Sequence, residues 1–206
     1  MPWLEMADLT SVEFGAAAPK LALLPVGATE QHGPNMALST DYVIAHRVAQ
    51  RLAEALGPVA AVVPPVPFGL SGHHTGFPGT ITLSERTFLA LLLDVAHSLK
   101  ANGFTHLLFV NGHNGNMPAL GVAASSALYE AGIKAAVAFY FAQAADRVRA
   151  HGKTPRYGHA CEVEASVGLA LAPEIVRRDA LAPGDTIAMN LPHGTNEQPF
   201  FLQVPI

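Results

Sequence analysis

The segment KLALLPVGATEQHGPNMALSTD, residues 20–41, decides the fold of this chain and draws attention to one place in it. It begins with an apolar run, residues 20–26, which predicts a buried strand. Two carboxylates and an imidazole follow within the same segment, at Glu30, His32 and Asp41. The first question that the sequence raises is why a soluble domain would place these groups where a buried strand ends.

The remainder of the chain alternates short apolar runs with longer helical patterns. Further strands are predicted at residues 59–66, 105–111 and 133–141. Apolar residues at helical spacing predict helices that begin near Thr40, Ser84, Pro118 and Glu162. Strands that alternate with helices form a mostly parallel sheet covered on both faces. The sequence therefore predicts an α/β fold, and because it shows no repeat or long linker we expect one domain over residues 1–206.

The composition excludes several classes of protein. Half of the 206 residues are hydrophobic and 14% are charged, which is typical of a compact globular protein. The formal net charge is −4 and no basic cluster is longer than Arg177-Arg178, which argues against nucleic acid or an anionic membrane as a partner. A single cysteine, Cys161, excludes an internal disulfide framework and fits a reducing compartment. With no signal-like N-terminus and no apolar run that could span a bilayer, we expect a cytoplasmic protein.

Acids and histidines follow each of the predicted strands. In parallel α/β sheets, ligands bind at the carboxyl ends of the strands. The side chains that follow the four predicted strands are Glu30, His32, His74, His113, His159, Glu162 and Glu164. Because all of them fall at the same predicted edge of the sheet, the sequence predicts a site there.

These residue types favour a metal site. If residues 30–32 are extended, alternate side chains point the same way, so Glu30 and His32 would face one side together. Carboxylates and imidazoles suit Zn²⁺, Mn²⁺ or Fe²⁺, and one carboxylate that bridges two metals would explain the excess of acids. Taken singly, Asp41 or Glu162 reads equally well as an ordinary acid in the first turn of a helix.

Other catalytic motifs are absent or weak. VNGHNGN, residues 110–116, lacks the Gly-Lys-Ser/Thr of a phosphate-binding loop. Neither a G-x-G-x-x-G after the first strand nor a G-x-S-x-G elbow is present. A nucleophilic Cys161 beside His159 is the one remaining alternative of this kind.

Four segments together resemble the creatininase family of amidohydrolases: LPVGATEQHGPNMALSTD, HHTGFPGTITLS, FVNGHNGN and HACEVEAS. They occur in the order of the family and span about residues 21–177. The resemblance implies a three-layer α/β/α sandwich with a mostly parallel, Rossmann-like sheet, a dinuclear metal centre and commonly a homohexamer. Family members open cyclic amides, remove formyl groups from aminopyrimidines or trim a modified peptide, so the resemblance does not fix the substrate.

The resemblance also implies the metal ligands. Glu30 and His113 would bind one metal ion, His32 would bind the other, and Asp41 would bridge the two. Gly115 stands where creatininase itself has a glutamate that completes the shell of the second metal. The replacement for this ligand is expected at Glu164 or, as the second choice, at Glu162.

Three further residues match family positions near the metals. His159 matches a histidine that resembles a general acid/base, which we expect to protonate the leaving nitrogen near the ordinary imidazole pKa of about 6.5. His74 matches a histidine that lines the pocket. Asn116 matches the asparagine that closes the loop.

Departures from the family shape the expected function. Asn35, Cys161 and Ala165 stand where histidine, glycine and threonine are usual, and the only tryptophan, Trp3, is far from those that enclose creatinine. We therefore expect a metal-dependent amidohydrolase that acts on another small cyclic amide, a formamide or a short peptide amide. The cofactors would be two divalent metal ions that activate water, most often zinc, with manganese or iron as alternatives.

Two other readings stay open. The departures also fit an inactive relative that binds a metal or a peptide. The chain stops before the Gly-rich loop and the last helix that are usual in the family, which fits either this reading or a C-terminal truncation. A metallophosphatase is disfavoured because the four segments contain no arginine or lysine to clamp a phosphate.

Overall fold

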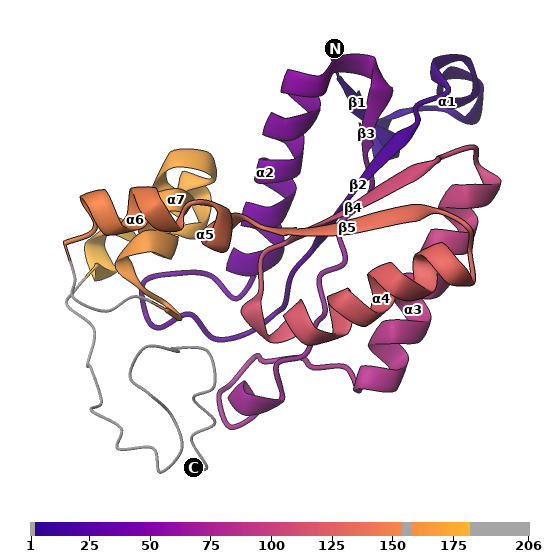
Figure 1. The fold of residues 1–206 in the computed structure, drawn as a ribbon. Coiled ribbons are helices and arrows are strands. Elements are labelled where there is room, and N and C mark those ends of the chain that lie inside the picture. Colours follow the sequence, from indigo (N-terminus) through magenta and orange to yellow (C-terminus); the bar gives the residue numbers. More distant parts are fainter. Residues whose placement is uncertain (1–2, 154–157, 182–206) are drawn as a thin grey trace.

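A computed structural model describes residues 3–153 and 158–181, which form a parallel sheet with helices on both faces (Figure 1). The five strands lie in the order β1-β3-β2-β4-β5, and every neighbouring pair is parallel. Their bounds are Leu4–Glu5 (β1), Leu21–Val26 (β2), Ala60–Val62 (β3), His106–Asn111 (β4) and Lys134–Phe139 (β5). The predicted α/β fold with a mostly parallel sheet is confirmed.

Alternate residues of the central strand contribute to two separate cores. Leu23 of β2 packs with α2 (Thr40–Leu56) on one face of the sheet. Leu24 packs with α3 (Glu85–Ala101) and α4 (Met117–Tyr129) on the other face. A strand buried on both faces needs apolar residues at every position, which explains the unbroken run LALLPV.

The long helices begin and end at residues that the sequence marks. The Oγ atom of Ser84 accepts a hydrogen bond from the backbone N–H of Thr87 at 3.2 Å and caps α3. Pro118 lies in the first turn of α4, where its missing N–H has no cost. α2 ends at Leu56 and is followed by the cap residue Gly57, whose φ of +70° favours glycine.

The second and fourth predicted strands are shorter than expected. β3 ends at Val62, just before Pro64 and Pro65, which cannot donate to a strand ladder. β5 ends at Phe139, and the rest of the apolar run forms the short helix α5 (Tyr140–Gln143). Both boundaries fall where an apolar run continues, so the run alone does not mark the end of the strand.

Several short elements were not predicted. They include β1 and α1 (Ser11–Ala17), although Thr10 and Glu13 form a capping box at the start of α1. The helix α6 follows α5 at Ala145–His151. Single 3₁₀ turns lie at Met6–Asp8, Gly57–Val59, Gly72–His74, Asn114–Asn116, Pro173–Ile175 and Arg178–Ala180.

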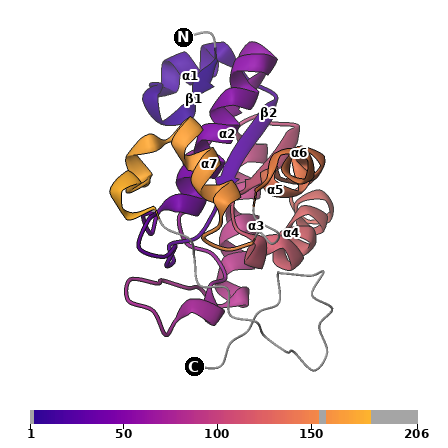
Figure 2. The same ribbon diagram turned by 90° about the vertical axis from the view of Figure 1, so that its left-hand side faces the viewer.

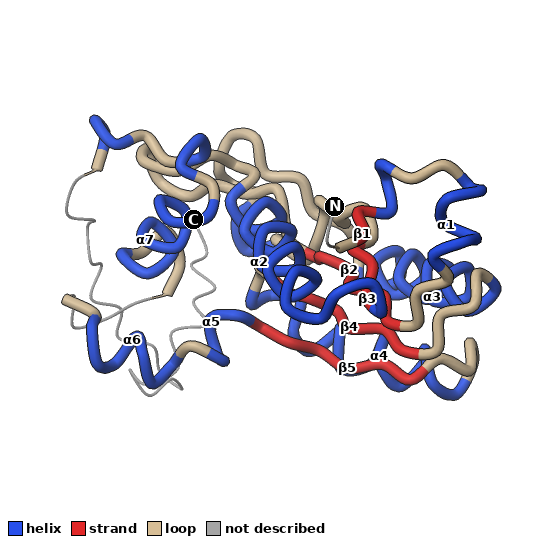
Figure 3. Tube along the Cα trace, turned by 90° about the horizontal axis from the view of Figure 1, so that it is seen from above, coloured by secondary structure: helices blue, strands red, loops and turns tan. Residues whose placement is uncertain are grey.

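The order of the strands places a crevice at the carboxyl ends of β2 and β4. From β2 the chain passes to β3 on one side of the sheet, and later continues with β4 on the other side. Such a reversal of direction is where open α/β sheets bind their ligands. The helices α5, α6 and α7 (Glu162–Leu171) lie beyond this edge of the sheet (Figures 2 and 3). Among the helices of the described residues, none is both long and apolar enough to cross a membrane.

Candidate metal centre

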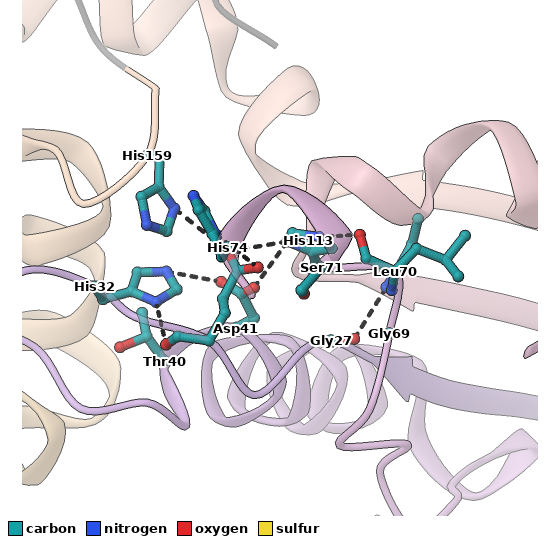
Figure 4. Close-up of polar contacts among 12 residues, drawn as sticks. Gly27, His32, Thr40, Asp41, Gly69, Leu70, Ser71, His74, His113 and His159 are labelled. Carbon is teal, nitrogen blue, oxygen red and sulfur yellow. Dashed lines mark hydrogen bonds and ion pairs between the residues drawn. The ribbon is translucent and has the colours of Figure 1, made fainter. Parts of the chain in front are cut away.

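Side chains from five loops and helix ends meet at this crevice. Figure 4 shows His32, Asp41, His74, His113 and His159 pointing toward one another. The buried polar residues of the site are Glu30, His32, Asp41, His113 and Glu164. The structure therefore brings together, from separate parts of the chain, the residues that the sequence placed at one sheet edge.

Two glycines let the start of α2 approach the ends of β2 and β4. A Cβ atom on Gly27 would lie 2.3 Å from the backbone nitrogen of Tyr42, and one on Gly112 would lie 2.1 Å from the backbone oxygen of Asp41. Neither position has room for a side chain, because real Cβ atoms do not come this close to backbone. This close packing delivers the carboxylate of Asp41 into the crevice.

Asp41 lies at the centre of the site with one oxygen toward each of two histidines. Its Oδ1 atom is 3.0 Å from Nε2 of His32, and its Oδ2 atom is 3.0 Å from Nδ1 of His113. A carboxylate that faces two separate imidazoles has the arrangement needed to contact two cations at once.

Both of these histidines are held through their other ring nitrogen. Nδ1 of His32 lies 3.2 Å from the backbone oxygen of Glu30, and Nε2 of His113 lies 3.2 Å from the backbone oxygen of Leu70. Metal-binding histidines usually donate this second N–H to a carbonyl or carboxylate, which fixes the tautomer and the direction of the ring. The two rings are therefore held so that their free nitrogens face Asp41.

Glu30 lies within reach of three imidazoles. Its Oε1 atom is 3.3 Å from Nδ1 of His113 and 3.4 Å from Nδ1 of His159. Its Oε2 atom is 3.1 Å from Nδ1 of His74. The side chain of Glu30 is buried, so these ring nitrogens are the polar groups that surround it.

Glu164 and Glu162 have separate surroundings. Oε2 of Glu164 accepts the backbone N–H of Cys161 at 3.3 Å in a capping box of α7, and Oε1 lies 4.0 Å from Nε2 of His32. The carboxylate of Glu162 accepts the backbone N–H of Lys153, at 2.9 and 3.0 Å. Of the two acids, the structure brings only Glu164 next to the buried histidines.

Several buried atoms of the site have no hydrogen-bond partner in the described part of the chain. They are both carboxylate oxygens of Glu30, Oδ2 of Asp41, Nε2 of His32 and Nδ1 of His74. Unpartnered buried polar atoms are rare, and each one needs an explanation. Carboxylate oxygens and imidazole nitrogens that converge without hydrogen bonds fit a bound divalent cation.

The described residues contain three sets of possible metal ligands, and within each set the ligand atoms lie within 4.8 Å of one another. The sets are His32 with Asp41 and Glu164, Glu30 with His73 and His113, and Glu30 with His32 and His159. His73 was not predicted by sequence reasoning, which singled out its neighbour His74. Its ring stacks on that of His113 with centroids 5.8 Å apart. The doublet HH at residues 73–74 was the available signal, and both side chains line the cleft.

The electrostatics of the site favour positive charge. Burial would lower the pKa of His32, but the carboxylate of Asp41 outweighs it and raises the pKa to about 9. Burial is likewise outweighed at His113, where contacts with Asp41 and Glu30 raise the pKa well above its ordinary value. Burial raises the pKa of Glu164 to about 7, an effect that the charge of His32 only partly offsets. The carboxylates thus create a negative field that a metal cation would also neutralise.

His159 behaves differently from the two buried histidines. Its side chain is 30% exposed, and its ring lies against those of His32 and His74 with centroids 4.4 and 4.3 Å apart. Burial, together with the charge of His32, lowers the pKa of His159 to about 3. This direction differs from the expected ordinary pKa of about 6.5 and favours the neutral ring; the role of His159 as general acid/base stays a prediction.

The loop after β4 is held in place by two asparagines. Nδ2 of Asn116 donates to the backbone oxygen of Gly27 at 3.0 Å, and its Oδ1 accepts the backbone N–H of Leu70 at 2.9 Å. Asn111 donates to the backbone oxygen of His113 at 2.7 Å and accepts its N–H at 3.1 Å. Asn116 therefore ties together the loops that follow β2, β3 and β4, and supports the predicted closing of the loop.

Gly115 has a steric reason to be glycine. A Cβ atom at this position would lie 2.5 Å from Nε2 of His113 and 2.7 Å from the backbone oxygen of Leu70. These are the two atoms whose contact orients His113. A glutamate at position 115 would therefore disturb His113 in this chain.

An open cleft lies over the site. It is lined by the polar cluster and by backbone and apolar groups, among them Gly112, Gly115, Phe139, Phe141 and Gly158. Partial burial raises the pKa of the nearby Cys161 thiol, which is the opposite of what activates a cysteine nucleophile.

Comparisons with known proteins agree with this geometry. The family description "Creatinine amidohydrolase" matches residues 7–200. The "Mycofactocin precursor peptide peptidase" of Mycolicibacterium smegmatis is 37% identical over 181 residues, which cover 86% of this chain and 68% of that protein. The "Creatinine amidohydrolase" of Pseudomonas putida is 34% identical over 119 residues, which cover 54% of this chain and 45% of that protein.

Solved structures give the same result. A crystal structure of creatinine amidohydrolase superposes with a TM-score of 0.81 at 28% identity, covering 95% of this chain and 82% of that one. Two further neighbours, with TM-scores of 0.75 and 0.69, are described as a manganese creatininase and a creatininase variant of Zn-Zn type. Agreement in family match, sequence identity and fold means that this chain belongs to the creatininase family of hydrolases.

Proposed function

We propose that this protein is an amidohydrolase that hydrolyses a small amide with the help of two divalent metal ions. Zinc is the first candidate for these ions, and manganese and iron are the alternatives. The observation that carries the proposal is the position of Asp41, whose two oxygens each lie 3.0 Å from a different buried imidazole. Unpartnered buried oxygens around it support the same assignment. Solved relatives described with manganese or zinc support divalent metals as the cofactors.

The ligand atoms divide into two sets around Asp41. Glu30 and His113 would hold one ion, His32 and Glu164 would hold the other, and Asp41 would contact both. Metal ions held by these residues would supply a water of lowered pKa and a Lewis acid for the substrate carbonyl. Glu162 is not assigned as a ligand, because its carboxylate faces the backbone of Lys153.

The remaining residues of the cleft would bind and orient the substrate. His159 is neutral and partly exposed at the edge of the cleft, where it can offer a hydrogen bond to the reacting amide. Nδ1 of His74 lies 3.1 Å from Oε2 of Glu30, and this contact would fix the direction of the Glu30 carboxylate. Phe139 and Phe141 give one wall of the cleft an apolar character.

A short peptide amide is the first substrate class to test. The relative with 37% identity is described as a peptide peptidase, whereas the one with 34% identity is described as a creatinine amidohydrolase. An open cleft with apolar walls accommodates the end of a peptide, and a cyclic amide or a formamide is the next choice.

The alternative of an inactive relative finds little support at the three positions that motivated it. Ala165 is buried in an apolar cluster, Cys161 caps α7, and the backbone oxygen of Asn35 accepts the N–H of Arg177. None of these three residues displaces a proposed ligand. Among the described residues that line the cleft there is also no arginine or lysine, which supports an amide rather than a phosphate ester as substrate.

The proposal is tested by hydrolysis assays on protein stripped with a chelator and then reloaded with zinc or manganese. The panel would contain short peptides, lactams and formamides, with p-nitrophenyl phosphate as the comparison substrate. We expect metal-dependent release of an amine from at least one amide and no release of phosphate. Metal-loaded protein that hydrolyses no amide, or only the phosphate ester, would contradict the proposal.

A further inference from the structure

Gln31 lies between two proposed metal ligands in the sequence but makes a different contact. Its Nε2 atom lies 2.8 Å from Nε2 of His159, and its Oε1 atom accepts the backbone N–H of Gly33 at 3.1 Å. The side chain thus joins the segment after β2 to the segment before α7. Neither the metal ligands nor the cleft lining accounts for this residue.

The contact with Gly33 fixes which end of the amide faces the histidine. A backbone N–H can only donate a hydrogen bond, so the group that faces Gly33 must be the carbonyl oxygen of Gln31. The NH₂ group therefore faces His159. Gly33 has a φ of +64°, which favours glycine, so this turn is held in a conformation that few other residues adopt.

The direction of the amide determines the protonation of His159. An NH₂ group can donate but cannot accept, so Nε2 of His159 must be the acceptor and carries no proton. In a neutral imidazole the proton is then on Nδ1. That atom lies 3.4 Å from Oε1 of Glu30, a buried oxygen that has no hydrogen-bond partner in the described residues. The contact with Gln31 therefore specifies the Nδ1–H tautomer of His159.

We propose that Gln31 is a positioning residue that holds His159 as the neutral Nδ1–H tautomer, with this N–H directed into the cleft. His159 would then act as a hydrogen-bond donor to the oxygen on which negative charge develops. Neutral imidazoles serve as electrophiles of this kind in other enzymes, and preorganised donors of this type stabilise oxyanions. Only this catalytic consequence rests on the proposed function; the tautomer itself does not.

The experiment is nitrogen-15 NMR of the histidine rings, which distinguishes protonated from unprotonated ring nitrogens. Zinc-loaded protein would be compared with Gln31→Glu and Gln31→Met, and the signals of His159 would be assigned by their loss in His159→Gln. A matched control is Gln50→Met, because the amide of Gln50 approaches a different histidine, His46, at 3.4 Å. Circular dichroism would confirm that each variant is folded.

We expect the unchanged protein to show His159 protonated on Nδ1. In Gln31→Glu the new carboxylate can only accept, so the proton should move to Nε2, and Gln31→Met should show a mixture of both forms. Gln50→Met should leave the signals of His159 unchanged. A proton on Nε2 in the unchanged protein, or the same tautomer in Gln31→Glu and Gln31→Met as in the unchanged protein, would overturn the proposal.

Metal content measured on the same samples separates this inference from the proposed function. If the protein retains no zinc, the proposed function fails, and the tautomer is then read on the metal-free protein with the same two outcomes. If zinc is retained and the tautomer does not respond to residue 31, only the inference fails.

Discussion

The two halves of the site are built in different ways. One half comes from the edge of the sheet, where Glu30, His113 and the start of α2 are packed against strand ends without space between them. The other half comes from the region after β5, where Glu164 belongs to the capping box of a helix and His159 precedes that helix. Close backbone packing fixes the positions of the side chains in the first half, which we call the sheet half. Hydrogen bonds at a helix end fix those in the second, which we call the helix half.

This difference separates two tasks within one site. A ligand fixed by the packing of strands cannot adjust, so the sheet half would define where cations are held. A ligand on a helix end, with one oxygen used by the capping box, completes the site from outside. We infer that changes in the sheet half affect both metal positions, whereas changes in the helix half affect one.

The largest effect that tests this comparison is expected from Glu164→Gln. The amide can still form the cap but is a poor ligand, so we expect about one of the two metal equivalents to be lost, together with more than about 100-fold of activity. Metal analysis and the amide assay would measure both. The matched control is Glu162→Gln, which removes an acid from the same turn of α7 and should retain both metals. If the two variants lose metal equally, the helix half is wrongly assigned.

A second test changes the sheet half without replacing a proposed metal ligand. In Gly115→Ala the added Cβ would displace the ring of His113 from the backbone oxygen of Leu70. We expect metal affinity to fall by about 10- to 100-fold, the range found when the support of a metal ligand is removed. Gly121→Ala on α4 is the control, because nothing lies within 4 Å of its added Cβ. Equal affinities in both variants would contradict the role given to Gly115.

The pH dependence of metal binding provides a third test. A histidine ligand must be neutral, and the pKa of His32 in the metal-free protein is raised to about 9 because the carboxylate of Asp41 outweighs the effect of burial. Metal must therefore displace a proton, and apparent affinity should rise by about tenfold per pH unit for each proton displaced, up to about pH 9.

The stability of the metal-free protein should change with pH in the opposite direction, and fall as the pH rises. The charged His32 stabilises the fold fully below its ordinary pKa of about 6.5, and this contribution is lost as the pH rises through about 9. Calorimetric titrations with zinc and thermal unfolding without it, between pH 6.5 and 9, would measure the two trends. A metal affinity that does not change with pH would show that no proton is displaced from the site.

The smallest effect is expected at Cys161, which lies between the two halves. Its thiol is partly buried and has a raised pKa, and its backbone N–H contacts Glu164. Cys161→Ala should therefore keep both metals and full activity, with a change in unfolding free energy of about 1 kcal/mol or less from the weakened cap. Loss of turnover with both metals still bound would restore the alternative of a cysteine nucleophile.

The residues of the sheet half could be predicted from the sequence, whereas those of the helix half could be predicted only in part. Glu30, His32 and His113 each follow a predicted strand closely, so the rule that parallel sheets bind at their carboxyl ends was enough to bring them together. The long helices α2 and α3 were also predictable, because apolar spacing and caps agree over many residues.

The remaining features depend on contacts that no local pattern reveals. The apolar run at residues 133–141 changes from strand to helix at Tyr140, where periodicity cannot distinguish a buried strand from a buried helix. The choice between Glu164 and Glu162, and the presence of His73 beside His74 at the site, depend on side-chain directions that tertiary packing sets. The low pKa of His159 arises from burial and from the charge of His32, two effects that the sequence does not show.

The most direct test of the whole account is the metal content of the purified protein beside Asp41→Ala, measured by mass spectrometry without chelator. Asp94→Ala, which removes an exposed acid from α3, is the matched control. The account predicts about two equivalents per chain in the unchanged protein and in the control, and a loss from both positions in Asp41→Ala. Metal content that is unchanged in Asp41→Ala, or absent from the unchanged protein, would contradict the dinuclear centre.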